Sequence, residues 1–218
     1  MNRSEIMCRA GHILKVESMS QHHHHDHKHE EHSFKNVEDY VARFDAPDRD
    51  EWQKPDEVFD VIGLKQGDKI VDFGAGTGYF SVRASERVGK GIVYAIDSEP
   101  EMLNYLAKRT SKAELTNVEI ILVEHDEIEL PEPVDVILLV NVYHHINDRV
   151  SKFSRVKQWL RDGGKIVVIE ARAGTPIEPP AHFLMTEEQV ASEFADAGYK
   201  LISDSKILPY QSLQIFGA

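Results

Sequence analysis

Three glycines at alternate positions follow an apolar segment that carries an acid near its end, and this is the strongest chemical signal in the chain. The acid is Asp72, and the loop after it consists of Gly74, Ala75, Gly76, Thr77 and Gly78. Glycine has no Cβ and tolerates positive φ, so its backbone can approach a ligand closely. The helix expected to begin at Tyr79 would offer unpaired N–H groups at its start. The pattern therefore predicts a strand-to-helix turn that binds a small ligand through its main chain.

The spacing of these glycines separates the loop from the dinucleotide-binding fingerprint. That fingerprint needs its third glycine at the position where this chain has Tyr79. An acid followed by G-x-G-x-G resembles the first motif of the class I S-adenosylmethionine-dependent methyltransferases. The resemblance implies that the loop lies under the methionyl part of this cofactor. A glycine-rich turn with no ligand is the alternative interpretation.

A second apolar segment, residues 91–96, is followed by Asp97. In nucleoside-binding α/β folds, a carboxylate at this place can accept hydrogen bonds from ribose hydroxyls. The resemblance gives Asp97 that role for the adenosyl ribose and places Ser98 and Met102 near the cofactor. Ser98 and Glu101 also have the spacing of a helix-capping box. The alternative is that Asp97 only sets up the start of that helix.

An acidic loop follows the third expected strand, residues 118–123. In the family, an acid shortly before a Leu-Pro pair receives the adenine amino group, and Asp126 fits this position before Leu130. The resemblance gives Glu127 a backbone contact to the adenine ring. A solvated acidic turn is the alternative.

The loop after residues 134–140 contains the candidate catalytic residues. It begins at Asn141, which we assign to the cofactor side, and continues through Tyr143, His144 and His145. The resemblance implies that this loop faces the transferable methyl group and the acceptor. Methyl transfer needs alignment and dry surroundings, and a histidine suits the removal of a proton from the acceptor. Tyr143 could instead line the site, and either histidine could simply pack under the next helix.

These residues must be positioned by alternating strands and helices. Apolar periodicity predicts strands at 69–73, 91–96, 118–123, 134–140, 165–170, 199–204 and 211–216, and helices at 79–88, 99–110, 149–161 and 186–197. Such alternation indicates an α/β, doubly wound, mostly parallel sheet with helices on both faces. The resemblance adds that the sheet has seven strands and that the last is antiparallel. Ligands bind such sheets beyond the carboxyl ends of the strands.

The N-terminal part of the chain divides into two expected regions. Residues 1–33 form a polar leader with a His-rich tract at 22–32, and we expect it to be disordered. The tract has no fixed ligand spacing, so no defined metal site is expected. Residues 34–218 form the predicted methyltransferase domain, in which residues 34–66 make a helical arm. The resemblance implies that this arm covers cofactor and substrate, with Arg49 or Trp52 closing on them, although Trp52 could equally pack the arm onto the sheet.

Composition limits the classes of partner. The 218 residues carry a formal net charge of −12, which opposes binding to nucleic acid or an anionic membrane. No apolar run approaches the ~18 residues of a membrane span, and the single cysteine, Cys8, allows no intrachain disulfide. We therefore expect a cytoplasmic enzyme that transfers a methyl group from S-adenosylmethionine to a small-molecule acceptor, in an oligomeric state that is not predicted. The alternative is a non-catalytic nucleoside-binding or metal-handling protein that works through the His-rich tract.

Overall fold

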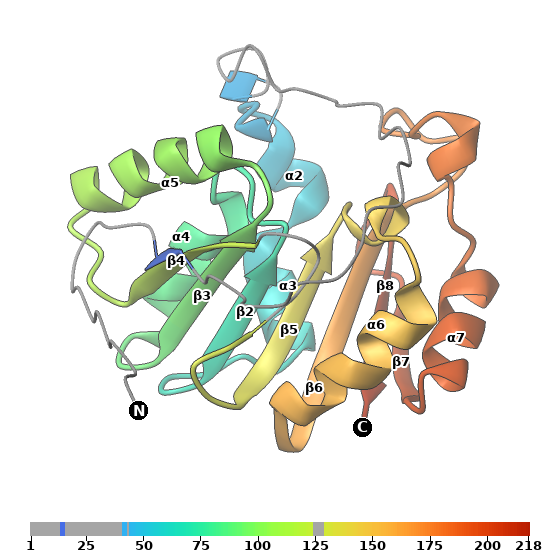
Figure 1. Ribbon diagram of the computed structural model, residues 1–218. Helices are drawn as coiled ribbons and strands as arrows, with labels where there is room; N and C mark the ends of the chain where they lie inside the picture. Colours follow the sequence, from blue (N-terminus) through green and yellow to red (C-terminus); the bar gives the residue numbers. More distant parts are fainter. Residues whose placement is uncertain (1–13, 16–40, 43, 124–128) are drawn as a thin grey trace, which may run out of the picture.

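A single β-sheet forms the centre of the computed structural model, which describes residues 14–15, 41–42, 44–123 and 129–218. Its strand order is β1-β4-β3-β2-β5-β6-β8-β7. The strands are β1 (Leu14–Lys15), β2 (Lys69–Phe73), β3 (Ile92–Asp97), β4 (Val118–Leu122), β5 (Val134–Val140), β6 (Leu160–Ala171), β7 (Lys200–Ser205) and β8 (Gln211–Gly217). The helices of the α type are α2 (Arg49–Gln53), α3 (Pro55–Val61), α4 (Tyr79–Val88), α5 (Pro100–Lys112), α6 (Arg149–Val156) and α7 (Glu187–Asp196). Figure 1 shows the sheet with these helices around it.

The seven strands β2–β8 confirm the doubly wound, mostly parallel sheet. Strands β2 to β6 pair in parallel, and β8 runs antiparallel between β6 and β7. An eighth strand, β1, was not expected: Leu14 and Lys15 pair in parallel with Ile121 and Leu122 of β4. These two residues belong to the leader predicted to be disordered, and the rest of that leader lies outside the described residues. The sheet is therefore wider by one short edge strand than the sequence predicted.

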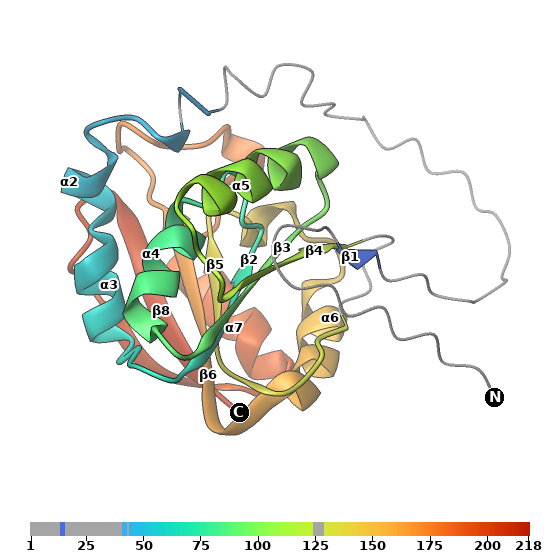
Figure 2. The same ribbon diagram turned by 90° about the vertical axis from the view of Figure 1, so that its left-hand side faces the viewer.

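Helices cover both faces of the sheet, as the pattern of alternation requires (Figure 2). On one face, Phe59 of α3 and Phe80 of α4 pack against the central strands, and Leu106 of α5 packs beside them. On the other face, Phe153 of α6 and Phe194 of α7 join the larger apolar core. The apolar run of β5 is buried because side chains from both sides of that strand enter a core, as in parallel sheets generally.

Most helix and strand boundaries agree with those expected from the apolar periodicity, but the helix expected at 149–161 ends early and the strand expected at 165–170 begins early. Helix α4 spans Tyr79–Val88, the predicted range. The helix expected at 149–161 ends at Val156, continues as a 3₁₀ turn (η2, Lys157–Trp159), and gives way to β6 five residues before the strand expected there. The capping box at Ser98 is also wrong. Helix α5 begins at Pro100, its N-cap is Glu99 and not Ser98, and no side chain caps it. The Asp97 carboxylate accepts the Glu99 N–H just before the helix.

The carboxyl ends of the central strands form one edge of the sheet, at the top of Figure 1. Strand β2 lies between β3 and β5, so the chain winds away from β2 in opposite directions on its two sides. That reversal is the switch point at which open α/β sheets bind ligands. None of the helices in the described part of the chain is long and apolar enough to cross a membrane.

Candidate functional site

The loop between β2 and α4 is held by main-chain hydrogen bonds and close packing. Its first two N–H groups, from Gly74 and Ala75, both donate to the carbonyl of Ile96 at 2.9 and 3.0 Å. Gly78 has φ +81° as the N-cap of α4, and a Cβ there would lie 2.0 Å from Cδ1 of the buried Leu106. The positive φ and the packing of Leu106 therefore require glycine at position 78.

Gly76 is different, because little of the protein crowds it. Its φ is +53°, and a Cβ added to it would meet only Cδ2 of Phe44, at 4.0 Å. The positive φ favours glycine here although packing does not require it, and the open space leaves the backbone accessible from outside the loop. This is the place at which a ligand could contact the main chain.

Asp97, at the end of β3, binds the loop from the neighbouring strand. Its Oδ2 accepts the Gly76 N–H at 2.7 Å, and its Oδ1 accepts the Glu99 N–H at 3.0 Å. A carboxylate offers about four acceptor sites, so these bonds leave part of its acceptor capacity for a ligand. Burial raises the pKa of Asp97 above its ordinary value, and these backbone donors lower it in part. Asp97 thus sets up the start of α5 and retains acceptor capacity for a ribose.

A second carboxyl group, Asp72, lies behind the loop. It is 4% exposed and accepts a hydrogen bond of 2.6 Å from the Ser81 hydroxyl. Burial raises the pKa of Asp72 to about 6, and the nearby Asp97 adds to this while Ser81 opposes it. Two acids close together in a desolvated place favour a cationic ligand, since a positive charge would stabilise both carboxylates. The sulfonium of S-adenosylmethionine fits this requirement.

The N-terminal arm lies against the glycine loop at this same edge (Figure 1). Arg49 of α2 stacks on Tyr79, with its guanidinium carbon 3.7 Å from the ring centroid, and Arg83 lies 4.0 Å from the same centroid. Burial lowers the pKa of Arg49 to about 10. Farther along the arm, Asp45 pairs at 2.8 Å with Arg109 of α5, whose Nη1 also donates to the loop at the Thr77 carbonyl.

A row of side-chain amides continues from the arm to the acceptor side of the sheet. Arg49 donates to Gln53, Gln53 donates to Gln211 at 3.0 Å, and Gln211 donates to Asn141 at 3.0 Å. Both glutamines are fully buried. Buried amides are costly unless they are bonded, so this row ties α2, β8 and the end of β5 together. Asn141 itself adopts φ +53° and uses its side-chain oxygen in this network.

His144 and Glu170 form a pair at the carboxyl ends of β5 and β6. His144 belongs to the 3₁₀ turn η1 (Tyr143–His145), and its Nδ1 lies 2.6 Å from Oε2 of Glu170. The two side chains are 7% and 2% exposed. Sequence reasoning missed Glu170, although this residue follows the apolar run of β6 just as Asp97 follows that of β3. That shared signal could have identified it.

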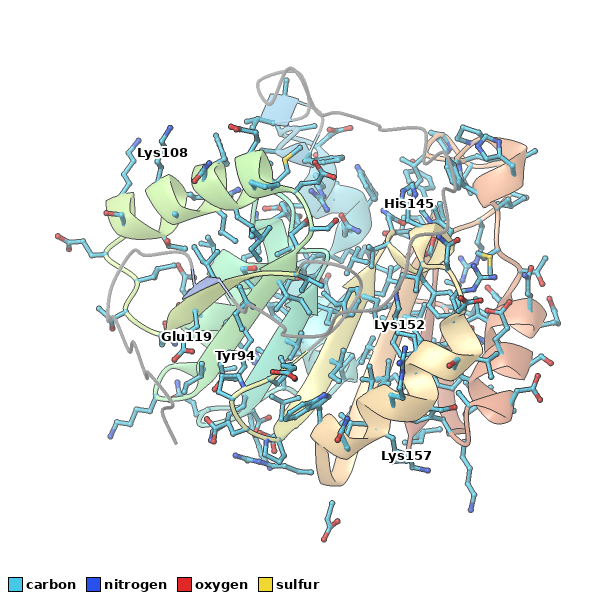
Figure 3. All side chains as sticks on the ribbon, viewed as in Figure 1. Tyr94, Lys108, Glu119, His145, Lys152 and Lys157 are labelled. Atoms are coloured by element: carbon cyan, nitrogen blue, oxygen red, sulfur yellow. The ribbon has the colours of Figure 1, made fainter. Side chains whose placement is uncertain are left out.

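His145 is exposed and lies beside another 3₁₀ turn, η3 (Ala181–Phe183), as Figure 3 shows. Its ring centroid is 4.1 Å from that of His144 and 4.7 Å from that of Phe183. Phe183 is in turn 5.3 Å from His144. Aromatic rings from two loops therefore surround the His144–Glu170 pair.

The structure does not support Tyr143 as a residue of the acceptor site. Tyr143 is 1% exposed, and its ring stacks on Phe194 at 5.3 Å within the core. Its hydroxyl donates to Glu193 of α7 at 2.8 Å. Burial and this bond both raise the pKa of Tyr143. Because its side chain is committed beneath α6 and α7, Tyr143 is a core residue, and its predicted place at the acceptor is corrected.

The structure describes Met102, Ser98 and Trp52, but it does not describe Asp126 and Glu127. Met102 is 1% exposed on α5, whereas Ser98 is exposed at the end of β3. Trp52 packs near Tyr210, with ring centroids 6.2 Å apart, in agreement with a packing role for Trp52. The adenine-binding predictions for Asp126 and Glu127 lie outside the described residues, as does the His-rich tract at 22–32. Within the described ranges, no cluster of three or more metal-ligating side chains is found.

The glycine loop, the expected cofactor side of this edge, lies against residues 141–145, the expected acceptor side. A Cβ added to Gly74 would lie 2.5 Å from Cγ2 of Val142, the residue between Asn141 and η1. The glycine loop is therefore in direct contact with the loop that carries His144. An arrangement of this kind can hold a nucleoside on one side and a second molecule on the other.

The chain matches the family described as "Methyltransferase domain" over residues 64–204. Among solved structures, a SAM-dependent methyltransferase from Aquifex aeolicus is 28% identical and superposes with a TM-score of 0.77, covering 82% of this chain and 96% of that one.

Two curated relatives align over shorter stretches. The probable cobalt-precorrin-6B C(15)-methyltransferase (decarboxylating) of Sulfolobus acidocaldarius is 33% identical over 139 residues, which is 63% of this chain and 65% of the relative. The (S)-coclaurine N-methyltransferase of Thalictrum flavum subsp. glaucum is 23% identical over 105 residues, 48% of this chain and 29% of the relative. The chain therefore spans less than two thirds of the length of either relative.

Proposed function

We propose that this chain, which belongs to the methyltransferase-domain family of S-adenosylmethionine-dependent enzymes, methylates a small molecule at the carboxyl edge of its sheet. The enzyme class and the methyl donor follow from the family. The Asp72–Asp97 pair and the open backbone at Gly76 fit that donor. Our proposal adds that the acceptor is a small molecule and that it binds at the carboxyl edge of the sheet.

The contact between Gly74 and Val142 is the observation that carries this proposal, because it joins the two halves of the site. A methyl group bound over the glycine loop would have the η1 turn as its neighbour. An acceptor must reach the methyl carbon in line with the breaking bond, and a small molecule can be held this way between two loops. Two relatives are named for small acceptors, coclaurine and cobalt-precorrin-6B. The net charge of −12 disfavours a nucleic-acid acceptor.

The residues divide the work by their position. Asp97 and the open main chain at Gly76 contact the nucleoside and methionyl parts, and we retain Asp126 and Glu127 as predicted adenine contacts. His144 and His145 face the acceptor and are the candidates for removing its proton. Asn141 joins the two sides through its bond to Gln211.

The arm acts as a cover over the donor in this proposal. Phe44 is the nearest group to the open side of Gly76, and Arg49 and Asp45 clamp the arm to α4 and α5. Limited trypsin digestion, read at the bond between Arg49 and Asp50, tests this role. S-adenosylhomocysteine should protect this bond, and equal cleavage with and without it would contradict the cover.

The experiment for the function uses the full chain with methyl-labelled S-adenosylmethionine. Separate reactions contain a small-molecule metabolite extract, total RNA and total protein, and the Gly76→Ala variant is the control for each. Label transfer and S-adenosylhomocysteine release should appear with the metabolite extract and be lost in the variant. Transfer to RNA or protein alone would contradict the small-molecule acceptor.

A further inference from the structure

We infer that Glu170 positions His144 as the general base for an aromatic hydroxyl acceptor, an inference that rests on the proposed function. The pair joins residues that the chain separates by 26 positions. Their side chains are brought together because Asn141 N–H bonds to the Ile169 carbonyl at 2.8 Å, which sets the ends of β5 and β6 in register. His144 takes the proton, and Glu170 orients His144.

Glu170 decides which nitrogen of His144 carries the proton. An ionised carboxylate only accepts hydrogen bonds, so the nitrogen 2.6 Å from Oε2 must be the donor, Nδ1–H. In the neutral ring the lone pair then resides on Nε2. No described residue is bonded to Nε2, and the side chain keeps 7% of its surface exposed. Nε2 is therefore the atom available to take a proton from a bound molecule.

Burial gives the pair a further property. Glu170 is 2% exposed, and its side-chain oxygens are bonded only to His144 among the described residues, through Nδ1 and, at 3.4 Å, the main-chain N–H. A buried carboxylate is costly unless it is paired. An imidazolium at His144 would supply the missing positive charge, so Glu170 stabilises the state produced by proton removal.

The reaction step balances with these groups alone and the donor. The acceptor oxygen attacks the methyl carbon with a lone pair and forms the new C–O bond. The carbon–sulfur bond breaks, and its electron pair stays on sulfur, which becomes a neutral thioether. The acceptor proton passes to Nε2 of His144 and later leaves to solvent. Glu170 carries the opposite charge throughout.

The type of acceptor is set by the need for a base. A thiol ionises readily near neutral pH and a neutral amine already has a free lone pair, whereas a hydroxyl gains nucleophilicity when its proton is removed in the transition state. The surroundings favour a flat ring, because the exposed His145 and the partly exposed Phe183 pack beside the His144 ring and leave aromatic surface open. Aromatic ligands stack on surfaces of this kind. A phenol meets both conditions.

The tautomer can be measured without any methyl transfer. Heteronuclear NMR of the imidazole nitrogens, at mildly alkaline pH, should show His144 protonated on Nδ1 in the wild-type chain, with the signal assigned by its loss in His144→Gln. In Glu170→Gln the side-chain amide can donate to Nδ1, so this tautomer should no longer be fixed. A wild-type ring protonated on Nε2, or one unchanged in Glu170→Gln, overturns the positioning role even if the enzyme is active.

The acceptor class is tested with para-cresol and its thiol analogue, thiocresol, as the probes. Glu170→Gln should lower kcat for para-cresol by roughly 10²-fold, the lower end of general-base effects. The rate with thiocresol and the KM for S-adenosylmethionine should change little. Equal losses with both probes would mean a merely structural role for Glu170. Failure of the wild-type chain to methylate para-cresol contradicts the phenol assignment.

A matched variant separates these effects from the loss of a carboxylate as such. Glu178, on the exposed segment after β6, accepts the Gly174 N–H at 2.7 Å. Glu178→Gln should leave the His144 tautomer and both rates at wild-type values. If Glu178→Gln reproduces the effect of Glu170→Gln, the effect reflects general charge and the inference is wrong.

Discussion

The donor side and the acceptor side of the carboxyl edge differ in the groups that form them, which are mainly backbone on one side and side chains on the other. On the donor side, the proposed ligand contacts are the exposed main chain of one short loop and a single carboxylate, Asp97, which accepts the Gly76 N–H of that loop from the next strand. On the acceptor side, the proposed contacts are the side chains of the η1 turn, with Glu170 of β6 bonded to His144 and Phe183 of η3 packed beside both histidines. A site formed by backbone suits the recognition of one fixed cofactor. A site formed by side chains can change its acceptor through side-chain substitutions without disturbing the loop.

This difference also sets what each substitution should do. A change in the glycine loop acts on backbone geometry, so it threatens folding or donor affinity. A change at His144 or Glu170 removes one chemical group from a scaffold held elsewhere. Variants that separate folding, donor binding and turnover therefore measure how independent the two sides are.

The largest effect on folding should come from Gly78→Ala. Its φ of +81° is unfavourable for alanine, and the new Cβ would lie 2.0 Å from Leu106, which is fully buried. The left-handed conformation and the overpacking together should cost roughly 2–5 kcal/mol of unfolding free energy. Chemical denaturation measures this cost. Gly67→Ala is the control, because Gly67 has φ +86° with nothing within 4 Å of its Cβ position. Equal losses in both variants would show that contact with Leu106 is unimportant.

Asp72 should make stability depend on pH. Its folded pKa of about 6 is above its ordinary value of 3.8, so the folded protein binds more protons than the unfolded chain between these values. Stability contributed by Asp72 is then full below pH ~3.8 and falls as pH rises through ~6, by roughly 3 kcal/mol in total. Urea unfolding of wild type and Asp72→Asn across this window isolates the effect. A difference between the two proteins that does not vary with pH would contradict the buried position of Asp72.

Asp97→Ala should weaken donor binding by a smaller amount. It removes the acceptor of the Gly76 N–H and the proposed partner of the ribose, and the loss of charge-assisted hydrogen bonds suggests roughly 1.5–3 kcal/mol in S-adenosylhomocysteine affinity. Asp68→Ala is the control, since Asp68 also accepts a backbone N–H but in the turn before β2. Comparable weakening in both variants would remove the ribose role from Asp97.

The strand, turn and helix of the donor side could be predicted from the sequence because their signals are local. Asp72, the three glycines and Tyr79 lie within one short stretch, and their order alone specifies a strand, a turn and a helix. The family resemblance supplied the antiparallel last strand. One small error concerned the start of α5, where the N-cap is Glu99, one residue after the Ser98 expected from the capping-box spacing.

The loop with His144 and His145 was predicted for the acceptor side, but its contacts could not be, because they depend on strand register. Nothing in the sequence pairs His144 with Glu170, and only the alignment of β5 with β6 brings them together. The same holds for the amides of Gln53 and Gln211, which are separated by 158 positions. Tyr143 was misassigned because adjacent loop residues point in different directions, and periodicity does not reveal which of them enters the core.

Calorimetric titration of S-adenosylhomocysteine into the wild-type chain, Gly76→Ala and His144→Gln tests the separation of the two sides most directly. Gly76→Ala costs about 1–2 kcal/mol for the left-handed conformation but places its Cβ in open space, 4.0 Å from Phe44, so the variant should fold and yet lose about tenfold or more in affinity because the ligand needs that space. His144→Gln should bind within about a factor of two of wild type. Unchanged affinity in Gly76→Ala, or an equal loss in His144→Gln, would contradict a donor side built from backbone and independent of the acceptor side.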